Sequence, residues 1–88
     1  MIYEIRFSEK AEKDFSKIPK NDIIKILDKI ELLSENPYPA DYKKIKASDE
    51  NLYRIRQGDY RIIYSIKDKI QIVEVRRIGH RKNIYRNF

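Results

Sequence analysis

Two short stretches of alternating side chains, residues 52–57 and 60–64, predict a β-hairpin in the second half of the chain. Gly58-Asp59 lies between them and suits a type II′ turn, because that turn takes glycine at its first central position. The turn pairs residue 57 with 60, 56 with 61, 55 with 62, 54 with 63 and 53 with 64. Alternation then gives a core-facing side made of Tyr53, Ile55, Ile62 and Tyr64, and an opposite side made of Arg54, Arg56, Arg61 and Ile63.

The rest of the pattern predicts one earlier strand, two helices and one later strand. Residues 2–7 alternate and form the expected first strand. Ser8 is expected to cap a short helix that ends at Pro19, and Asn21 or Asp22 to cap a second helix that ends at 36–37. The second helix carries one apolar stripe, formed by Ile23, Ile26, Leu27, Ile30 and Leu33. Residues 43–46 are expected to approach the sheet in an extended form, and strands are expected at 52–57, 60–66 and 70–77.

This order of elements predicts an α+β fold. An N-terminal strand is followed by an antiparallel two-helix hairpin and an antiparallel three-strand meander, with both helices packed on one face of the sheet. The 88 residues suffice for a single domain, residues 1–88. The sequence has no cysteine and no apolar run long enough for a signal peptide or a membrane span. We therefore expect a cytoplasmic protein without disulfides and without a membrane partner.

Charge is distributed unevenly along the chain. Residues 1–41 hold seven Lys and Arg against nine Asp and Glu, whereas residues 42–88 hold thirteen against five. The second half therefore has a net charge of +8 and the first half −2. A basic half of this kind favours nucleic acid as a partner. Within it, Arg56 and Arg61 face each other across the predicted hairpin, where like charges are unfavourable, and an anion bound between them would relieve the repulsion.

The residues that common hydrolytic sites require are absent from the sequence. There is no glycine-rich phosphate loop, no Ser or Cys nucleophile beside the single histidine, and no carboxylate cluster with metal-ligand spacing. We therefore predict no metal and no cofactor. RNA brings its own nucleophile, the 2′-hydroxyl, so its cleavage needs positioning, charge stabilisation and proton transfer. The candidate catalytic groups are the three arginines of the hairpin together with His80, Arg81 and Tyr85 of the basic tail.

The hairpin sequence 52–64, followed by Ile78-Gly79-His80-Arg81-Lys82-Asn83-Ile84-Tyr85, resembles the signature of the RelE toxins of the RelE/ParE superfamily. The start 7–11, the joint 18–20 and the helix end 35–37 resemble it too, so the likeness covers essentially the whole chain. It implies a toxin that enters the ribosomal A site and cleaves mRNA, and a cognate RelB-like antitoxin that neutralises it in a higher-order complex. In that family the positions that match Arg54, Arg56, Arg61 and Arg81 are basic, and a tyrosine matches Tyr85. Some members carry lysine where this chain has Arg54 and Arg56; arginine is a poor general base, so we expect these residues to stabilise charge.

Further basic residues are expected to bind RNA or the ribosome. Lys43, Lys44 and Lys46 suit sequence-independent phosphate contacts. Arg76 and Arg77 point to opposite faces of a strand, so only one of them, Arg77, is included, and the tail adds Lys82 and Arg86. Two alternatives stay open from the sequence. One is a ParE-like inhibitor of DNA gyrase with the same fold, and the other is a nucleic-acid-binding member without catalytic activity. The hairpin arginines could also be a solvated sheet face, and His80 a turn residue.

Overall fold

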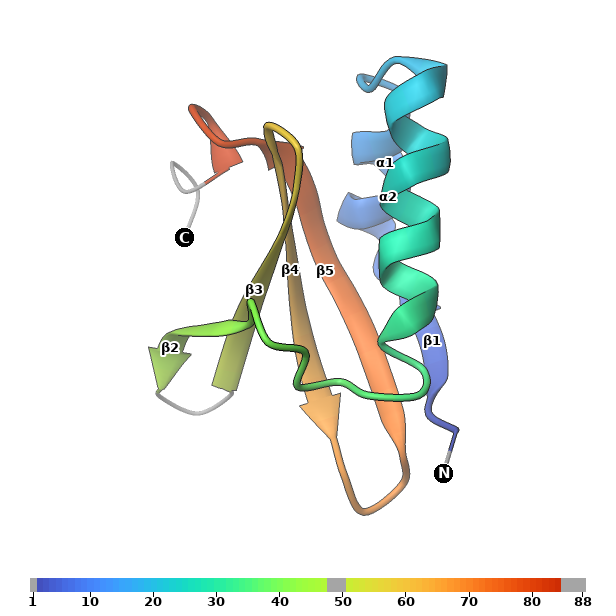
Figure 1. Ribbon diagram of the computed structural model, residues 1–88, viewed down its shortest axis with the longest axis vertical. Helices are drawn as coiled ribbons and strands as arrows, with labels where there is room; N and C mark the ends of the chain where they lie inside the picture. Colours follow the sequence, from blue (N-terminus) through green and yellow to red (C-terminus); the bar gives the residue numbers. More distant parts are fainter. Residues whose placement is uncertain (1, 48–50, 85–88) are drawn as a thin grey trace.

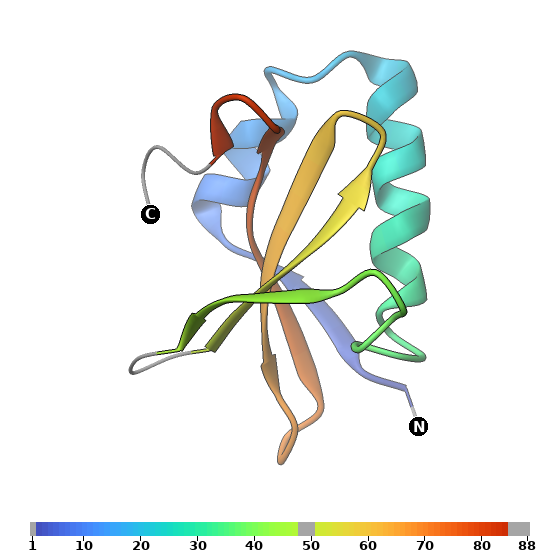
Figure 2. The same ribbon diagram turned by 60° about the vertical axis from the view of Figure 1, so that its left-hand side comes forward.

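A computed structural model describes residues 2–47 and 51–84 and has a five-stranded sheet at its centre. The elements along the chain are β1 (Glu4–Phe7), α1 (Glu9–Phe15), α2 (Lys20–Leu32), β2 (Lys43–Ala47), β3 (Asn51–Gln57), β4 (Tyr60–Lys67) and β5 (Ile72–His80). The strand order is β1-β5-β4-β3-β2, with β1 parallel to β5 and all other pairs antiparallel. Both helices lie on one side of the sheet (Figure 1; Figure 2). The predicted α+β fold is confirmed.

The β3–β4 hairpin has the predicted register. Residues 53 to 57 pair with 64 to 60 in turn, and Arg56 faces Arg61. Gly58 has a φ of +59°, and within the described residues only Gln71 among the non-glycine residues has a positive φ. Positive φ at the first central position alone is the type II′ geometry. The hairpin therefore follows from its glycine, and it fixes which side chains share a face.

The main core lies between the helices and the sheet. Ile26 and Ile30 of α2, together with its C-cap Leu33, are almost completely buried against Ile55, Ile62, Tyr64, Val73, Val75 and Ile78. This face is the one predicted from alternation. Burying an aliphatic side chain of this size contributes about 1.5–3 kcal/mol. The core therefore fixes the sheet, and with it the face that carries the arginines.

Several element boundaries differ from the prediction. The second helix begins at Lys20, because Pro19 is its N-cap and the Pro19 carbonyl accepts from Asp22 N and Ile23 N. Neither Asn21 nor Asp22 is the cap. Leu27 is 42% exposed and is wrongly assigned to the core stripe. The last strand runs from Ile72 to His80, not from 70 to 77, because the turn occupies residues 68–71 and Ile70 is exposed.

Beyond Val75, the outer edge of β5 has no neighbouring strand, and α1 covers it. Ser8 caps α1 through the backbone N–H of Ala11, as predicted, and its hydroxyl also donates to the Arg76 carbonyl at 2.9 Å. The Asp14 carboxylate accepts from Ile78 N at 2.9 Å. Edge strands expose unpaired backbone groups that need partners. A short helix therefore replaces a strand at this position.

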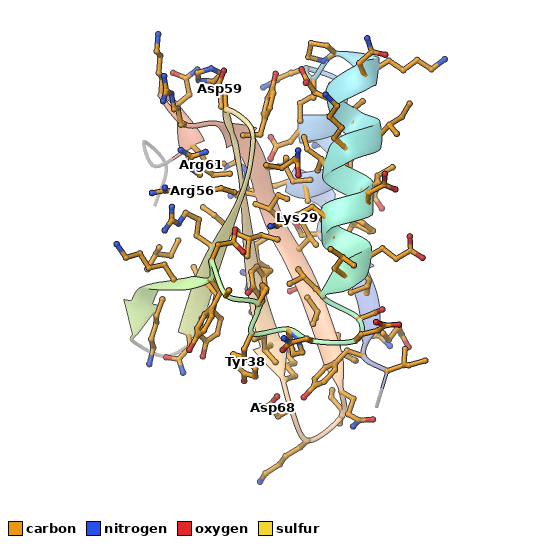
Figure 3. The ribbon with its side chains drawn as sticks, in the orientation of Figure 1. Lys29, Tyr38, Arg56, Asp59, Arg61 and Asp68 are labelled. Atoms are coloured by element: carbon orange, nitrogen blue, oxygen red, sulfur yellow. The ribbon has the colours of Figure 1, made fainter. Side chains whose placement is uncertain are left out.

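Three tyrosine hydroxyls form hydrogen bonds that link the N-terminal segment and the segment between α2 and β2 to the sheet. Tyr3 and Tyr38 donate to the two oxygens of Asp68, at 2.8 and 3.0 Å, in the β4–β5 turn (Figure 3). Tyr64 donates to the Pro37 carbonyl at 2.8 Å. Partial burial and the hydrogen bond to Asp68 raise the pKa of Tyr38 to about 12. These contacts fasten residues 37 and 38 of this segment to β4 and to the β4–β5 turn.

Candidate functional site

The face of the sheet that the helices leave uncovered, called the outer face below, carries the predicted arginines. Arg56 is exposed and Arg61 is half-buried, and they lie directly opposite each other on β3 and β4. Their side chains point away from α2 (Figure 3). The Arg61 Nη1 donates to the carbonyls of Gly58 and Tyr60, at 3.2 and 3.0 Å. The structure therefore brings these two cations together beside the hairpin turn, as the register predicts.

Arg54 shares this face but is only 6% exposed. Its Nε is buried without a hydrogen-bond partner, and so is the hydroxyl of Ser65, which is 2% exposed and lies opposite Glu74 of β5. A buried polar atom without a partner costs about 1–3 kcal/mol. Sequence reasoning missed Ser65, since a serine within a strand carries no recognisable signal. The outer face therefore has a buried polar layer beneath its exposed cations.

The beginning of the C-terminal segment is fastened to the hairpin turn. The backbone N–H of Arg81 donates to the Asp59 carbonyl at 2.8 Å, and its Nε lies 3.8 Å from the Asp59 carboxylate. Ile84 is 4% exposed and packs with Leu52 and Ile63 in a small cluster on the outer face. Arg81 is therefore held by Asp59 of the hairpin turn and by the buried Ile84 that follows it in the chain. It lies at the same end of the hairpin as Arg56 and Arg61. Tyr85 and Arg86 lie outside the described residues.

A glycine in β5 makes room for the Ile84 anchor. A Cβ built on Gly79 would lie 2.9 Å from the Ile84 Cδ1, closer than carbon atoms pack. The same β5 position faces Arg61. A glycine is therefore favoured at position 79 because the Ile84 side chain approaches its backbone closely. Packing of Ile84 against Gly79 in turn helps to fix the position of Arg81.

His80 is not brought together with the arginines. Its ring meets that of Tyr60 edge to face, with 5.8 Å between centroids, and Tyr60 packs on the helix-side core. The backbone N–H of Lys82 donates to His80 Nδ1 at 3.2 Å. An accepting Nδ1 places the proton of the neutral ring on Nε2. His80 therefore lies on the helix side of the sheet, and the Nε2 of its neutral ring is a hydrogen-bond donor.

The predicted RNA-binding residues are scattered. Lys43, Lys44 and Lys82 are exposed, while the side chain of Lys46 lies outside the described part of the structure. The Arg77 guanidinium turns to α1, where its Nε and Nη2 donate to the Asp14 carboxylate at 2.9 and 3.2 Å. The hydrogen bond to Asp14 raises the pKa of Arg77 further. Arg77 is therefore engaged in an ion pair with α1.

One acidic residue supports the site from the other side of β3. Asp41 accepts from the backbone N–H of Arg56 at 3.3 Å and pairs with Lys29 of α2 at 3.2 Å. Burial opposes ionisation of Asp41, but the hydrogen bonds from Arg56 and Lys29 lower its pKa below the usual value. Asp41 thereby fastens the backbone of β3 at Arg56. Sequence reasoning missed Asp41, since it lies in the loop before β2 and no local pattern relates it to Arg56.

The arrangement can bind and stabilise negative charge. Arg56, Arg61 and Arg81 present guanidinium groups around one hairpin turn, and guanidinium binds phosphate through two parallel hydrogen bonds. Among the residues that the structure describes, no three His, Cys, Asp or Glu side chains gather as a metal site. No helix in the described part of the chain is long and apolar enough to cross a membrane.

Comparisons with known proteins agree with one another. Residues 5–85 match the family described as ParE toxin of type II toxin-antitoxin system, parDE. A Methanocaldococcus jannaschii protein that carries the name RelE1 is 32% identical over 90 residues, covering 99% of each chain. Toxin RelG of Mycobacterium tuberculosis is 30% identical over 87 residues, covering 98% of this chain and 99% of its own. RelE of Pyrococcus horikoshii, solved in an archaeal RelE–RelB complex, superposes with a TM-score of 0.81 at 28% identity, over 94% of this chain and 99% of that one. The chain therefore belongs to the RelE/ParE family of type II toxin–antitoxin toxins.

Proposed function

We propose that this RelE-family toxin is a metal-independent endoribonuclease that cleaves mRNA in the ribosomal A site. The observation that carries the proposal is the opposed pair Arg56 and Arg61 with Arg81 anchored beside them. A pair of facing arginines costs stability unless it serves an anion. The scissile phosphate of an RNA strand is the anion that this family of toxins suggests.

In the proposed reaction the 2′-oxygen of the RNA attacks the neighbouring phosphorus. The 2′-hydroxyl loses its proton to solvent, the bond from phosphorus to the 5′-oxygen of the next nucleotide breaks, and that oxygen takes up a proton from solvent, leaving a cyclic phosphate and a 5′-hydroxyl. Arg56, Arg61 and Arg81 stabilise the additional charge on the phosphoryl oxygens in the transition state. Arg54 adds positive charge from the buried layer below. Tyr85 is proposed to stack on a base, and Lys43, Lys44, Lys46, Lys82 and Arg86 to contact RNA phosphates.

His80 has no part in this proposal. Its ring lies on the Tyr60 side of the sheet, away from the arginines. Its Nδ1 already accepts a hydrogen bond from Lys82 N.

We also propose a cognate antitoxin of the RelB type, because the archaeal relative was solved as a complex with RelB. The second half of the chain carries a net charge of +8, so an acidic segment that covers the outer face is the natural complement. A stable interface buries about 1,600 Å² in total, more than the arginine site alone offers. We therefore expect the antitoxin to extend from the outer face towards the helices. Co-expression with the neighbouring gene should yield a tight complex without cleavage activity.

The experiment adds the purified toxin to translating ribosomes in the presence of a chelator specific for transition metals, which leaves ribosomal magnesium in place. Primer extension should map cuts within the A-site codon, and the products should carry cyclic phosphate and 5′-hydroxyl ends. Intact message with trapped gyrase–DNA complexes would establish the ParE-like alternative instead. Intact message with retained RNA binding would establish the non-catalytic alternative.

A further inference from the structure

A hollow lies between α1, β5 and the segment that follows β5. Its volume is about 290 Å³. Six of its lining residues have polar or charged side chains, which are Asp14, Lys17, Tyr60, Arg77, His80 and Asn83. They come from α1, the segment after it, β4, β5 and the tail, and the proposed cleavage reaction uses none of them as a catalytic group. Small-molecule sites usually measure about 300–1,000 Å³, so the hollow suits a group the size of one nucleobase.

The floor of this hollow is electrically neutral. Asp14 is the one carboxylate that lines it, and its two oxygens accept from Arg77 Nε, Arg77 Nη2 and Ile78 N. The acid is thus fully occupied within the protein. An incoming anion meets a compensated ion pair and no free carboxylate.

The rim of the hollow is cationic. A neighbouring groove of about 370 Å³ shares Asp14, Lys17 and Arg77 with it and adds Lys10 and Lys13. Lys10, Lys13 and Lys17 follow one another at spacings of three and four residues, so they line one face along α1 and its C-terminal end. Of the two acids in the first turn of α1, Glu12 projects from a different face, whereas Glu9 lies one turn before Lys13 and borders the lysine face. A groove lined with ammonium groups therefore leads into the hollow.

The inner wall of the hollow is aromatic and can form hydrogen bonds. Tyr60 and His80 meet edge to face, and the His80 Nε2 is a donor because Nδ1 accepts from Lys82 N. The exposed Asn83 carries an amide that both donates and accepts. Aromatic rings that stack on bases, combined with cations that follow the backbone, are the means by which proteins bind single-stranded nucleic acid.

We propose that this groove is a second RNA site, which takes one nucleotide of a single strand. The base enters the hollow beside Tyr60 and His80, where Asn83 contacts its edge. The phosphates on either side follow Lys17, Lys13 and Lys10 along α1. The inference goes beyond the proposed cleavage and does not require it, since the groove lies between α1 and β5 and not at the β3–β4 arginine pair.

Fluorescence anisotropy with a labelled, uncleavable 2′-O-methyl hexauridylate tests the proposal, alongside an abasic hexamer with the same phosphates. Both are measured in an Arg56→Ala/Arg61→Ala background, which weakens binding at the outer face. Lys17→Glu should weaken binding of both hexamers. His80→Ala should weaken binding of the base-bearing hexamer alone, by about fivefold or more, the loss expected for one stacked base. Lys69→Glu, in the β4–β5 turn at the far end of the sheet, is the charge-matched control and should have a smaller effect.

Equal losses for Lys17→Glu and Lys69→Glu would overturn the proposal, because they would mean a general effect of net charge. Equal losses of the two hexamers in His80→Ala would overturn the base contact. Displacement of the hexamer by uridine monophosphate at equal concentration would assign the groove to free nucleotides instead of a strand. Thermal unfolding of each variant checks the fold; if His80→Ala unfolds, Asn83→Ala provides the same comparison.

Discussion

Replacing Asp14 with alanine should destabilise the domain by roughly 3 kcal/mol, because it breaks a largely buried ion pair whose loss costs about 3–5 kcal/mol in general. The Asp14 side chain is 9% exposed and accepts three hydrogen bonds, at 2.9, 3.2 and 2.9 Å. Alanine leaves the Ile78 N–H and the Arg77 guanidinium without their acceptor. We expect the lower end of the range because the Arg77 side chain is 20% exposed and can recruit water.

This loss is large on the scale of the whole domain. A chain of this length has a total stability of roughly 4–13 kcal/mol, at about 0.05–0.15 kcal/mol per residue. Asp14 alone would thus account for between a quarter and three quarters of it. The effect is large because the Asp14 carboxylate accepts hydrogen bonds both from the backbone of β5 and from the Arg77 guanidinium.

Urea unfolding followed by circular dichroism measures the effect, with Glu12→Ala as the matched control. Glu12 is an exposed acid on the same helix and should change stability by less than about 0.5 kcal/mol. In a double-mutant cycle, Arg77→Ala should add far less to Asp14→Ala than it costs alone. A cost below about 1 kcal/mol for Asp14→Ala, or additive effects in the cycle, would refute the reasoning.

Two further predictions concern packing and pH. Gly79→Ala should cost about 1 kcal/mol, the low end for overpacking, since its new Cβ would meet only the flexible end of the Ile84 side chain at Cδ1, and Ile84→Val should relieve much of that cost; urea unfolding of the double variant checks this, and additive losses would contradict it. Because the pKa of Tyr38 is about 12 in the folded state against 10.0 unfolded, folding retains a proton that the unfolded chain releases, so stability should fall as the pH rises from 10 to 12. Tyr38→Phe should be less stable at neutral pH but should lose less over that window, and an unchanged slope in unfolding experiments would show that Tyr38 does not contribute.

The hairpin and the α+β order could be predicted because local signals decide them. Gly58 before Asp59 selects the type II′ turn, and that turn fixes which arginines face each other. The parallel pairing of β1 with β5 is not encoded in any local pattern, since it joins the first and last strands. The start of α2 was missed because a proline takes the capping position where a polar side chain was expected.

The sequence predicts which arginines share a face of the hairpin, but it does not predict how deeply each one is buried or which partner it meets. Arg56, Arg61 and Arg81 gather at one end of the hairpin, as expected. Arg54 is buried instead of exposed. Arg77 turns to Asp14 beside the point where the register of β4 and β5 shifts, between Ile63 and Tyr64. A β-bulge of this kind redirects side chains, and the sequence carries no sign of it.

The central claim is that RNA is cleaved at the outer face, and the cleavage rate of Arg61→Ala at saturating ribosome tests it most directly. Loss of one group that stabilises transition-state charge should lower this rate by a factor of about 10² or more. Lys69→Ala, at the opposite end of the sheet, should cleave at the parental rate. An Arg61→Ala variant that folds normally and cuts message as fast as the parent would contradict the assignment of the active site to this face.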